Sequence, residues 1–158
     1  MKGWHLTVGL ILLFLAVPVQ AQTAAAKADI EKAVKAKVTQ LYGVLDTLNP
    51  EPYVKLWSRD KIIGALGPKG LETSFDVMAK DIQGYRDASK SRKTESVDII
   101  GVRVVSSEMA IAFSKTTFKA EVNNGNIYNI NMGNTTIWVK DSGEWKLAFF
   151  AGATAAKQ

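Results

Sequence analysis

The sequence predicts an α+β fold in which three helices cover one face of a mainly antiparallel sheet. Two observations support this prediction. In the first half of the chain, apolar residues recur at intervals of three and four, as along one face of an amphipathic helix. In the second half the interval changes to two, as in strands with one buried face, and short turn sequences join these strands, so that neighbouring strands run antiparallel.

The first 21 residues have the layout of a secretory signal peptide. Lys2 supplies positive charge, residues 6–17 are almost wholly apolar, and Pro18 precedes a small-residue cleavage motif that ends at Ala21. The apolar run of about 12 residues is shorter than the ~20 needed to span a bilayer. We therefore expect cleavage after Ala21 without a stable membrane anchor, and a periplasmic or secreted location.

Two helices are expected after this leader. Residues 22–28 are small and polar and form a flexible lead, and the first helix begins at an N-cap, Asp29. It ends before Pro50, because the residue that precedes a proline is disfavoured in the helical region. Pro50 and Pro52 then open a second, short helix, since proline is tolerated in a first turn.

A short strand, a turn and a third helix complete the first half. Residues 61–66 form a short apolar run typical of a strand, and the Gly-Pro-Lys-Gly sequence at 67–70 forms a turn. We expect the third helix over residues 71–85 and a polar loop over residues 87–93. The third helix places four apolar side chains on one face: Phe75, Met78, Ala79 and Ile82.

The second half of the chain contains four expected strands joined by tight turns: residues 96–106, 109–122, 127–140 and 144–152. An Asn-Gly sequence between the second and third of these is the strongest hairpin signal in the chain. In the last strand, Trp145, Leu147 and Phe149 alternate with their neighbours and are expected on one face. Residues 153–158 form a loose tail.

The composition excludes several kinds of catalysis. The chain has no cysteine, and its single histidine, His5, lies in the expected signal peptide. Nucleophilic catalysis by Ser-His-Asp or Cys-His is therefore excluded from the mature domain, and no metal or other cofactor is expected. The net charge is +5, and the clusters of basic residues lack the interleaved aromatic side chains of a nucleic-acid groove, so no nucleic-acid partner is expected.

Three stretches together resemble the nuclear transport factor 2-like superfamily, in its SnoaL-like and ketosteroid-isomerase-like branch. They are the short helix ending in Trp-Ser-Arg-Asp at 49–60, the strand and turn at 61–70, and the closing Asp-Ser-Gly-Glu-Trp-Lys-Leu at 141–147. The resemblance covers residues 29–152. It implies a cone-shaped fold with a pocket between the helices and the concave face of a curved sheet, and dimers formed through the sheet.

The chain departs from the catalytic patterns of this superfamily. Ketosteroid isomerases have an Asp base at the end of the first strand, where this chain has only apolar residues and glycine at 62–66. The polyketide cyclases rely on an Asp or a His-Asp pair, and the histidine is missing. An enzyme hypothesis stays open in which Tyr42 donates a proton and Asp46 or Asp60 acts as the base.

A third branch, the epoxide hydrolases, uses an Asp-Arg-Asp set. Asp98 and Arg103 lie five residues apart on one expected strand, so strict alternation places them on opposite faces and the set is not assembled. Many SnoaL-like relatives also have a His or Ser just after the last Trp-Lys pair, where this chain is apolar at 149–153. The sequence therefore favours a non-catalytic domain.

The expected pocket is aromatic and apolar, as small-molecule sites usually are. Its candidate ligand-binding residues are Tyr42, Trp57, Phe75, Phe113, Met132 and Trp138. The first hypothesis is a domain that binds a small apolar or amphipathic molecule and forms a homodimer. The second is the Tyr-Asp enzyme, and the third is a protein-interaction or dimerisation module that uses the exposed sheet face.

Three asparagines, Asn129, Asn131 and Asn134, make the third of the four expected strands unusually polar. Thr135 and Thr136 add to this polarity. Three interpretations stay open for these side chains: a solvated face, a dimer contact, or a hydrogen-bonding wall of the pocket.

Overall fold

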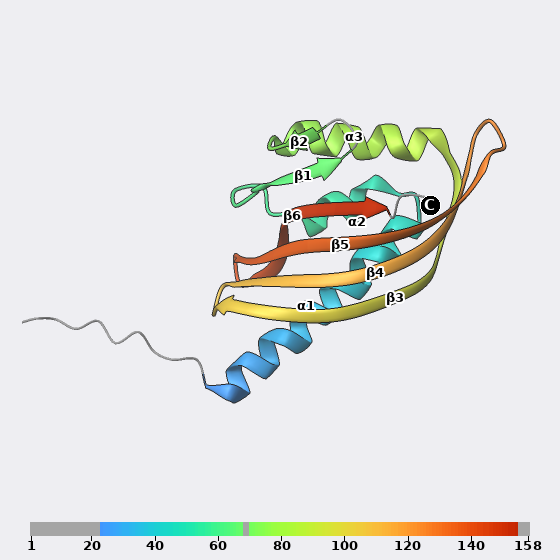
Figure 1. The fold of residues 1–158 in the computed structure, drawn as a ribbon. Coiled ribbons are helices and arrows are strands. Elements are labelled where there is room, and N and C mark those ends of the chain that lie inside the picture. Colours follow the sequence, from blue (N-terminus) through green and yellow to red (C-terminus); the bar gives the residue numbers. More distant parts are fainter. Residues whose placement is uncertain (1–22, 68–69, 155–158) are drawn as a thin grey trace, which may run out of the picture.

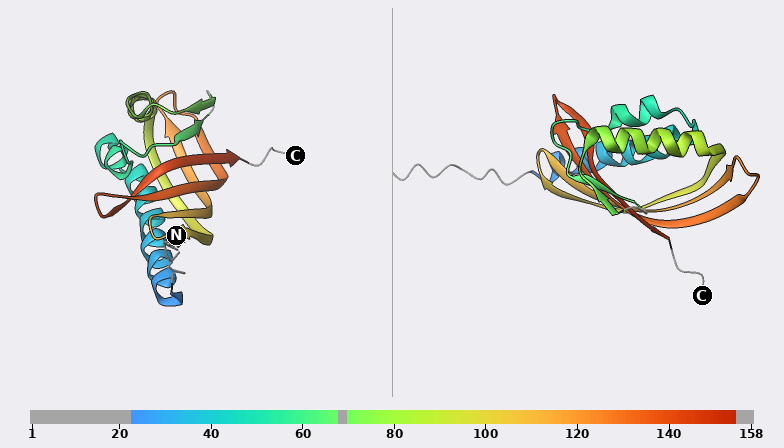
Figure 2. Two further views of the ribbon diagram at one scale, coloured as in Figure 1. Left: turned by 90° about the vertical axis from the view of Figure 1, so that its left-hand side faces the viewer. Right: turned by 90° about the horizontal axis from the view of Figure 1, so that it is seen from above.

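The computed structural model describes residues 23–67 and 70–154, in which three helices pack on one six-stranded sheet (Figure 1). The predicted α+β class is confirmed. The strand order is β2-β1-β6-β5-β4-β3. All three helices lie on the same, concave side of the curved sheet (Figure 2). The expected signal peptide, with its cleavage after Ala21, and His5 lie outside the described residues.

Helix α1 spans Ala24–Asp46 and begins five residues before the expected N-cap, Asp29. Thr23 is the N-cap, and its hydroxyl accepts a hydrogen bond from the Ala26 N–H at 3.2 Å. Most of the expected lead at residues 22–28 is therefore helical. The physical reason is the run of alanines behind a threonine cap, because alanine has the highest helix propensity.

Helix α2, Pro50–Leu56, begins where the prolines predict, and the Asn49 side chain caps it by accepting from Glu51 N–H at 3.1 Å. Helix α3, Phe75–Ala88, starts later than expected. The preceding residues instead form strand β2, Gly70–Glu72, which pairs antiparallel with β1, Gly64–Gly67. Strand β1 also pairs parallel with β6, so the hairpin extends the sheet at this edge.

The four-stranded antiparallel meander is confirmed: β3 Ser89–Ser106, β4 Met109–Val122, β5 Ile127–Asp141 and β6 Glu144–Thr154. Strand β4 has the expected bounds, whereas β3, β5 and β6 are longer than expected. The expected polar loop at 87–93 is wrong, because most of it forms the first part of β3, paired with the end of β4. Strand β6 continues into the expected tail as far as Thr154.

Bulges in β6 and β3 change which side chains face inward, and two of them bear on the predicted site residues. In β6, Ile137 pairs with Phe149 while the next residue of β5, Trp138, pairs with Leu147, so Ala148 is an extra residue. Because each extra residue inverts the alternation, Phe150 rather than Phe149 shares the inner face with Leu147. The expected grouping of Phe149 with Trp145 and Leu147 is therefore wrong.

A second bulge lies in β3 between Ile99 and Gly101. It returns Asp98 and Arg103 to one face of the sheet, where both are exposed. Strict alternation placed them on opposite faces, and that expectation is wrong. They lie on the face away from the helices, so they take no part in an inner pocket.

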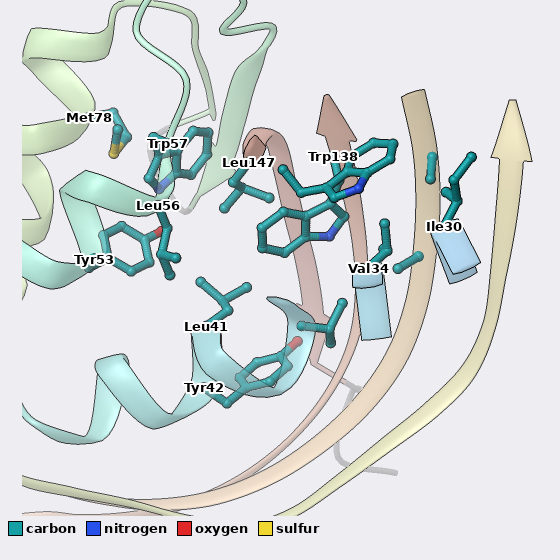
Figure 3. Packing of buried hydrophobic residues seen from close by; sticks show 14 residues of the cluster. Ile30, Val34, Leu41, Tyr42, Tyr53, Leu56, Trp57, Met78, Trp138 and Leu147 are labelled. Atoms are coloured by element: carbon teal, nitrogen blue, oxygen red, sulfur yellow. The ribbon is translucent and has the colours of Figure 1, made fainter. Parts of the chain in front are cut away.

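The hydrophobic core lies under α1 (Figure 3). Val34 and Leu41 of α1, together with Trp138 and Leu147 of the sheet, have no solvent exposure. The Trp138 indole satisfies its only donor within the core, because Nε1 donates to Thr136 Oγ1 at 2.9 Å. One end of the concave face is thus completely filled by side chains.

Candidate functional site

The other end of the concave face is hollow. A cavity of about 790 Å³ lies between β3–β6, the end of α1, α3 and the β1–β2 hairpin. Its size falls within the range of small-molecule sites, roughly 300–1,000 Å³. Apolar side chains form most of the wall, among them Leu45, Leu66, Leu71, Val77, Met78, Ile82, Phe118, Met132 and Phe150.

Hydrogen-bonding side chains gather where α1 crosses β4 and β5. The hydroxyls of Tyr42 and Ser114 are 3.0 Å apart, and both residues are buried. Two residues further along β4, Thr116 Oγ1 accepts a hydrogen bond from Asn134 Nδ2 at 3.0 Å. These four residues form a polar patch, which we call the cavity floor, and three of them, Tyr42, Thr116 and Asn134, line the cavity.

Asn134 has one polar atom without a partner. Its Nδ2 donates to Thr116 Oγ1 and also to the Met132 carbonyl at 3.2 Å. A carbonyl only accepts hydrogen bonds, so this contact fixes the amide orientation and leaves Oδ1 on the other side. Asn134 is 4% exposed, and Oδ1 has no hydrogen-bond partner among the described residues.

An ion pair lies beside the floor. Arg92 Nη1 donates to Asp46 Oδ1, and the Arg92 side chain is almost completely buried. Asp46 also accepts from Thr94 N–H at 2.8 Å and from the Thr94 hydroxyl at 2.8 Å. The Arg92 guanidinium lies over the Phe118 ring, 4.2 Å from its centroid. The carboxylate is therefore engaged by structural partners, and its charge is balanced.

Two of the tyrosines that line the cavity, Tyr42 and Tyr53, are buried, and burial favours their protonated form. Burial raises the pKa of Tyr42, although its hydrogen bond with Ser114 and the nearby Arg92 charge oppose the shift. Burial also raises the pKa of Tyr53 to about 12. Near neutral pH both phenols are uncharged hydrogen-bonding groups and not bases.

The structure does not bring the three candidate catalytic residues together. Tyr42 lines the cavity, but Asp46 is held by Arg92 and Thr94 and does not line it. Asp60 is exposed in the connection after α2. The carboxylates that do line the cavity, Glu72 and Asp81, belong to β2 and α3, where Glu72 is half-buried and Asp81 is exposed.

Two of the six candidate ligand-binding residues, Tyr42 and Met132, line the cavity. Trp57 and Trp138 are buried in the core instead. Phe75 lies at the start of α3, with the Arg59 guanidinium 4.5 Å from its ring centroid. Phe113 points to the outer face and is 41% exposed, because it alternates with the buried Ala112 and Ser114.

Sequence reasoning missed four residues that line the cavity: Arg92, Thr116, Phe118 and Phe150. It also missed Ser114, the partner of Tyr42 in the floor. The sequence contains a signal for Phe118. It lies an even number of residues after Ser114 and Thr116 along the strand, so it shares their face of the sheet, and Phe113 points to the opposite face. No local signal places Phe150 inward, since its direction depends on the bulge at Ala148. The hydrogen-bonding wall is the correct interpretation for Asn134, whereas Asn129 and Asn131 are exposed.

Within residues 23–67 and 70–154, no group of three or more His, Cys, Asp or Glu side chains is placed to hold a metal ion. None of the helices in these ranges is long and apolar enough to cross a bilayer.

No family model matches the sequence, and no curated protein sequence matches it. Solved structures do match the fold. A nuclear transport factor 2-like superfamily protein from Salmonella enterica has a TM-score of 0.67 at 16% identity, over 86% of this chain and 95% of that one. A ketosteroid isomerase-like protein from Erwinia carotovora has a TM-score of 0.69 at 13% identity, over 80% and 96%.

A hexachlorocyclohexane dehydrochlorinase of type 2 also matches, with a TM-score of 0.64 at 11% identity, over 85% of this chain and 90% of that one. At such identities the likeness establishes the fold alone. The expected nuclear transport factor 2-like fold, a curved sheet with the helices on its concave side, is confirmed.

Proposed function

We propose that the cavity binds one small, mainly apolar or amphipathic molecule, and that the domain acts by binding and not by acid–base catalysis. The observation that carries the proposal is a cavity of about 790 Å³ with mainly apolar walls. Beside its floor Arg92 and Asp46 form an ion pair in which each charge is balanced by the other. Filling such a cavity removes apolar surface from water on both partners, which stabilises the complex.

An enzymatic role is the alternative. It is supported by two structures of similar fold, a ketosteroid isomerase-like protein and a hexachlorocyclohexane dehydrochlorinase. It requires a free carboxylate within reach of Tyr42. Asp46 accepts three hydrogen bonds from Arg92 and Thr94, and Asp60 is exposed in the connection after α2. The binding proposal needs no such group, so we prefer it.

Titration with the neutral, polarity-sensitive dye Nile red tests the proposal. We expect saturable binding of one dye per chain, with the blue-shifted emission of an apolar site. Met132→Trp extends a large side chain into the cavity and should weaken binding at least tenfold. Phe113→Trp, on the outer face, is the matched control and should leave it unchanged. Equal binding by both variants would refute the proposal.

Native mass spectrometry of the protein purified from its own host extends this test. A retained small molecule would identify the natural occupant. The same spectrum gives the mass of the chain and hence tests the expected cleavage after Ala21.

Self-association is a second candidate function, favoured by one observation. Ile100, Val105 and Phe113 of β3 and β4 are large apolar side chains that are 61%, 53% and 41% exposed. Exposed apolar surface of this kind often marks an interface. We propose a homodimer through this face. Sedimentation equilibrium should give twice the chain mass, and Phe113→Lys should return the monomer; a monomeric parent protein would contradict it.

A further inference from the structure

The most unusual polar atom of the cavity floor is Asn134 Oδ1. Leaving a buried acceptor without a hydrogen bond is costly, so such an atom requires an explanation. Asn134 lines the cavity, and the orientation of its amide is fixed by the Met132 carbonyl and Thr116. The unpaired oxygen is therefore a fixed acceptor in a residue of the cavity wall, and the atom itself is shielded from solvent.

Met132 and Gly152 surround this oxygen. A Cβ atom on Gly152 would lie 2.5 Å from Met132 Sδ and 3.0 Å from Asn134 Oδ1. The sulfur and the oxygen thus converge on the space that the missing side chain leaves open. The Met132 thioether is thus a neighbour of the oxygen, and methionine changes rotamer easily because it is long and unbranched. A molecule in the cavity can reach Oδ1 when this side chain moves aside.

The charges at the floor restrict the chemistry of that molecule. Arg92 already has Asp46 as its counter-ion, so a carboxylate in the cavity would find no unbalanced positive charge and would face the oxygen of Asn134. An ammonium group at the floor would find its nearest carboxylate, Asp46, engaged by Arg92 and Thr94. The two carboxylates that line the cavity, Glu72 and Asp81, belong to β2 and α3 and not to the floor. An uncharged donor avoids both costs of desolvation.

We propose that the occupant is an uncharged molecule with an apolar body and a terminal hydroxyl, and that this hydroxyl donates to Asn134 Oδ1 after displacing the Met132 side chain. The hydroxyl oxygen is then free to accept a hydrogen bond from the hydroxyls of the floor, where Tyr42 lies 3.0 Å from Ser114. This inference rests on the proposed binding function and adds the chemical class of the ligand.

Three ligands with one apolar body test the proposal: 4-hydroxybiphenyl, 4-methoxybiphenyl and biphenyl-4-carboxylate. Their dissociation constants are measured by isothermal titration calorimetry. The hydroxyl compound both donates and accepts, the ether only accepts, and the carboxylate is charged. In the unaltered protein we expect the hydroxyl compound to bind tightest and the carboxylate weakest.

The decisive quantity is the ratio of the ether and hydroxyl dissociation constants, compared between variants so that differences in solubility cancel. Asn134→Leu removes the acceptor and should lower this ratio about five- to tenfold, the value of one hydrogen bond. Asn131→Leu is the matched control, because Asn131 is exposed on the same strand. It should leave the ratio unchanged. Asn134→Ala removes the same oxygen if the leucine variant does not fold.

The possible outcomes separate this inference from the proposed function. A ratio that is the same in the unaltered protein and in both Asn134 variants overturns the hydroxyl inference, whatever the affinity, and leaves apolar binding intact. Tightest binding of the carboxylate overturns it as well. If none of the three ligands binds and Nile red does not bind either, the proposed function itself fails. Met132→Ala uncovers Oδ1 and should raise the ratio.

Discussion

The two ends of the concave sheet face are built from the same strands but are covered differently. At the filled end α1 lies directly on the sheet and buries five residues: Ile30, Val34, Val38, Leu41 and Tyr42. At the hollow end α3 buries only Met78, and its other apolar side chains, such as Val77 and Ile82, line the cavity. The cavity lies between the apolar side chains of this helix and the sheet, and both contribute to its wall.

This difference implies that the two ends respond differently to the same kind of substitution. The filled end has no spare volume, so removing or adding atoms changes the free energy of unfolding strongly. The hollow end has spare volume, so there the change appears mainly in ligand affinity.

Removing the largest core side chain should have the largest effect. Trp138→Ala removes an indole with 0% exposure and should lower the free energy of unfolding by about 3–5 kcal/mol. Met132→Ala, which shortens a half-buried side chain at the cavity, should cost about 2 kcal/mol or less. Urea unfolding followed by circular dichroism gives both values. Equal losses would show that the hollow end is packed as tightly as the filled end.

The sequence predicted the helices and strands better than it predicted the cavity, since Trp57 and Trp138 were assigned to the pocket and belong to the core. The period-two pattern and the Asn-Gly turn predicted the meander, and the prolines predicted the start of α2, because these signals are local. The inward direction of Phe150 depends on the extra residue Ala148, which only the pairing of β5 with β6 reveals. Asp46 and Arg92 are 46 residues apart, and no local pattern indicates that they pair.

The ion pair beside the cavity floor provides the next test. Asp46→Asn keeps an acceptor for Thr94 but leaves the Arg92 guanidinium buried without its counter-ion. We expect a loss of about 3 kcal/mol in the free energy of unfolding, since breaking a largely buried pair on one side is strongly destabilising. Asp87→Asn, at the exposed pair with Arg86, is the control and should leave the free energy of unfolding almost unchanged. Similar losses in both variants would contradict a buried pair at the floor.

The boundary between the two ends can be tested with pH. Tyr53 belongs to the core and also lines the cavity, and its pKa is raised from 10.0 to about 12. The folded state therefore favours the protonated phenol. Its contribution is complete below pH 10 and is lost as the pH rises towards 12, by about 3 kcal/mol for a shift of roughly two units.

The free energy of unfolding should thus fall between pH 10 and 12, and Tyr53→Phe should remove much of this fall. Some of it should remain, because burial raises the pKa of Tyr42 in the same direction. Tyr128→Phe is the control, since Tyr128 is 48% exposed on β5. An unchanged alkaline profile in Tyr53→Phe would mean that water reaches this phenol through the cavity.

Adding two carbon atoms at the filled end and one at the hollow end gives the smallest changes in stability and the sharpest contrast. Ala112→Val adds volume under α1, where Ala112 is 1% exposed, and should cost about 1–3 kcal/mol by overpacking. Gly152→Ala adds a carbon that would lie 2.5 Å from Met132 Sδ. This sulfur is near the end of a flexible side chain, which can move into the cavity. We expect less than about 1 kcal/mol there, because alanine also disfavours the unfolded chain relative to glycine.

The cost of Gly152→Ala should appear in binding instead. The displaced Met132 side chain occupies cavity volume, so Nile red should bind several-fold more weakly while the unfolding midpoint hardly changes. In Ala112→Val the order should be reversed, with a lower midpoint and nearly unchanged dye binding. If both variants lost stability alike, Gly152 would belong to a filled layer, and the hollow end would have no free volume to offer a ligand.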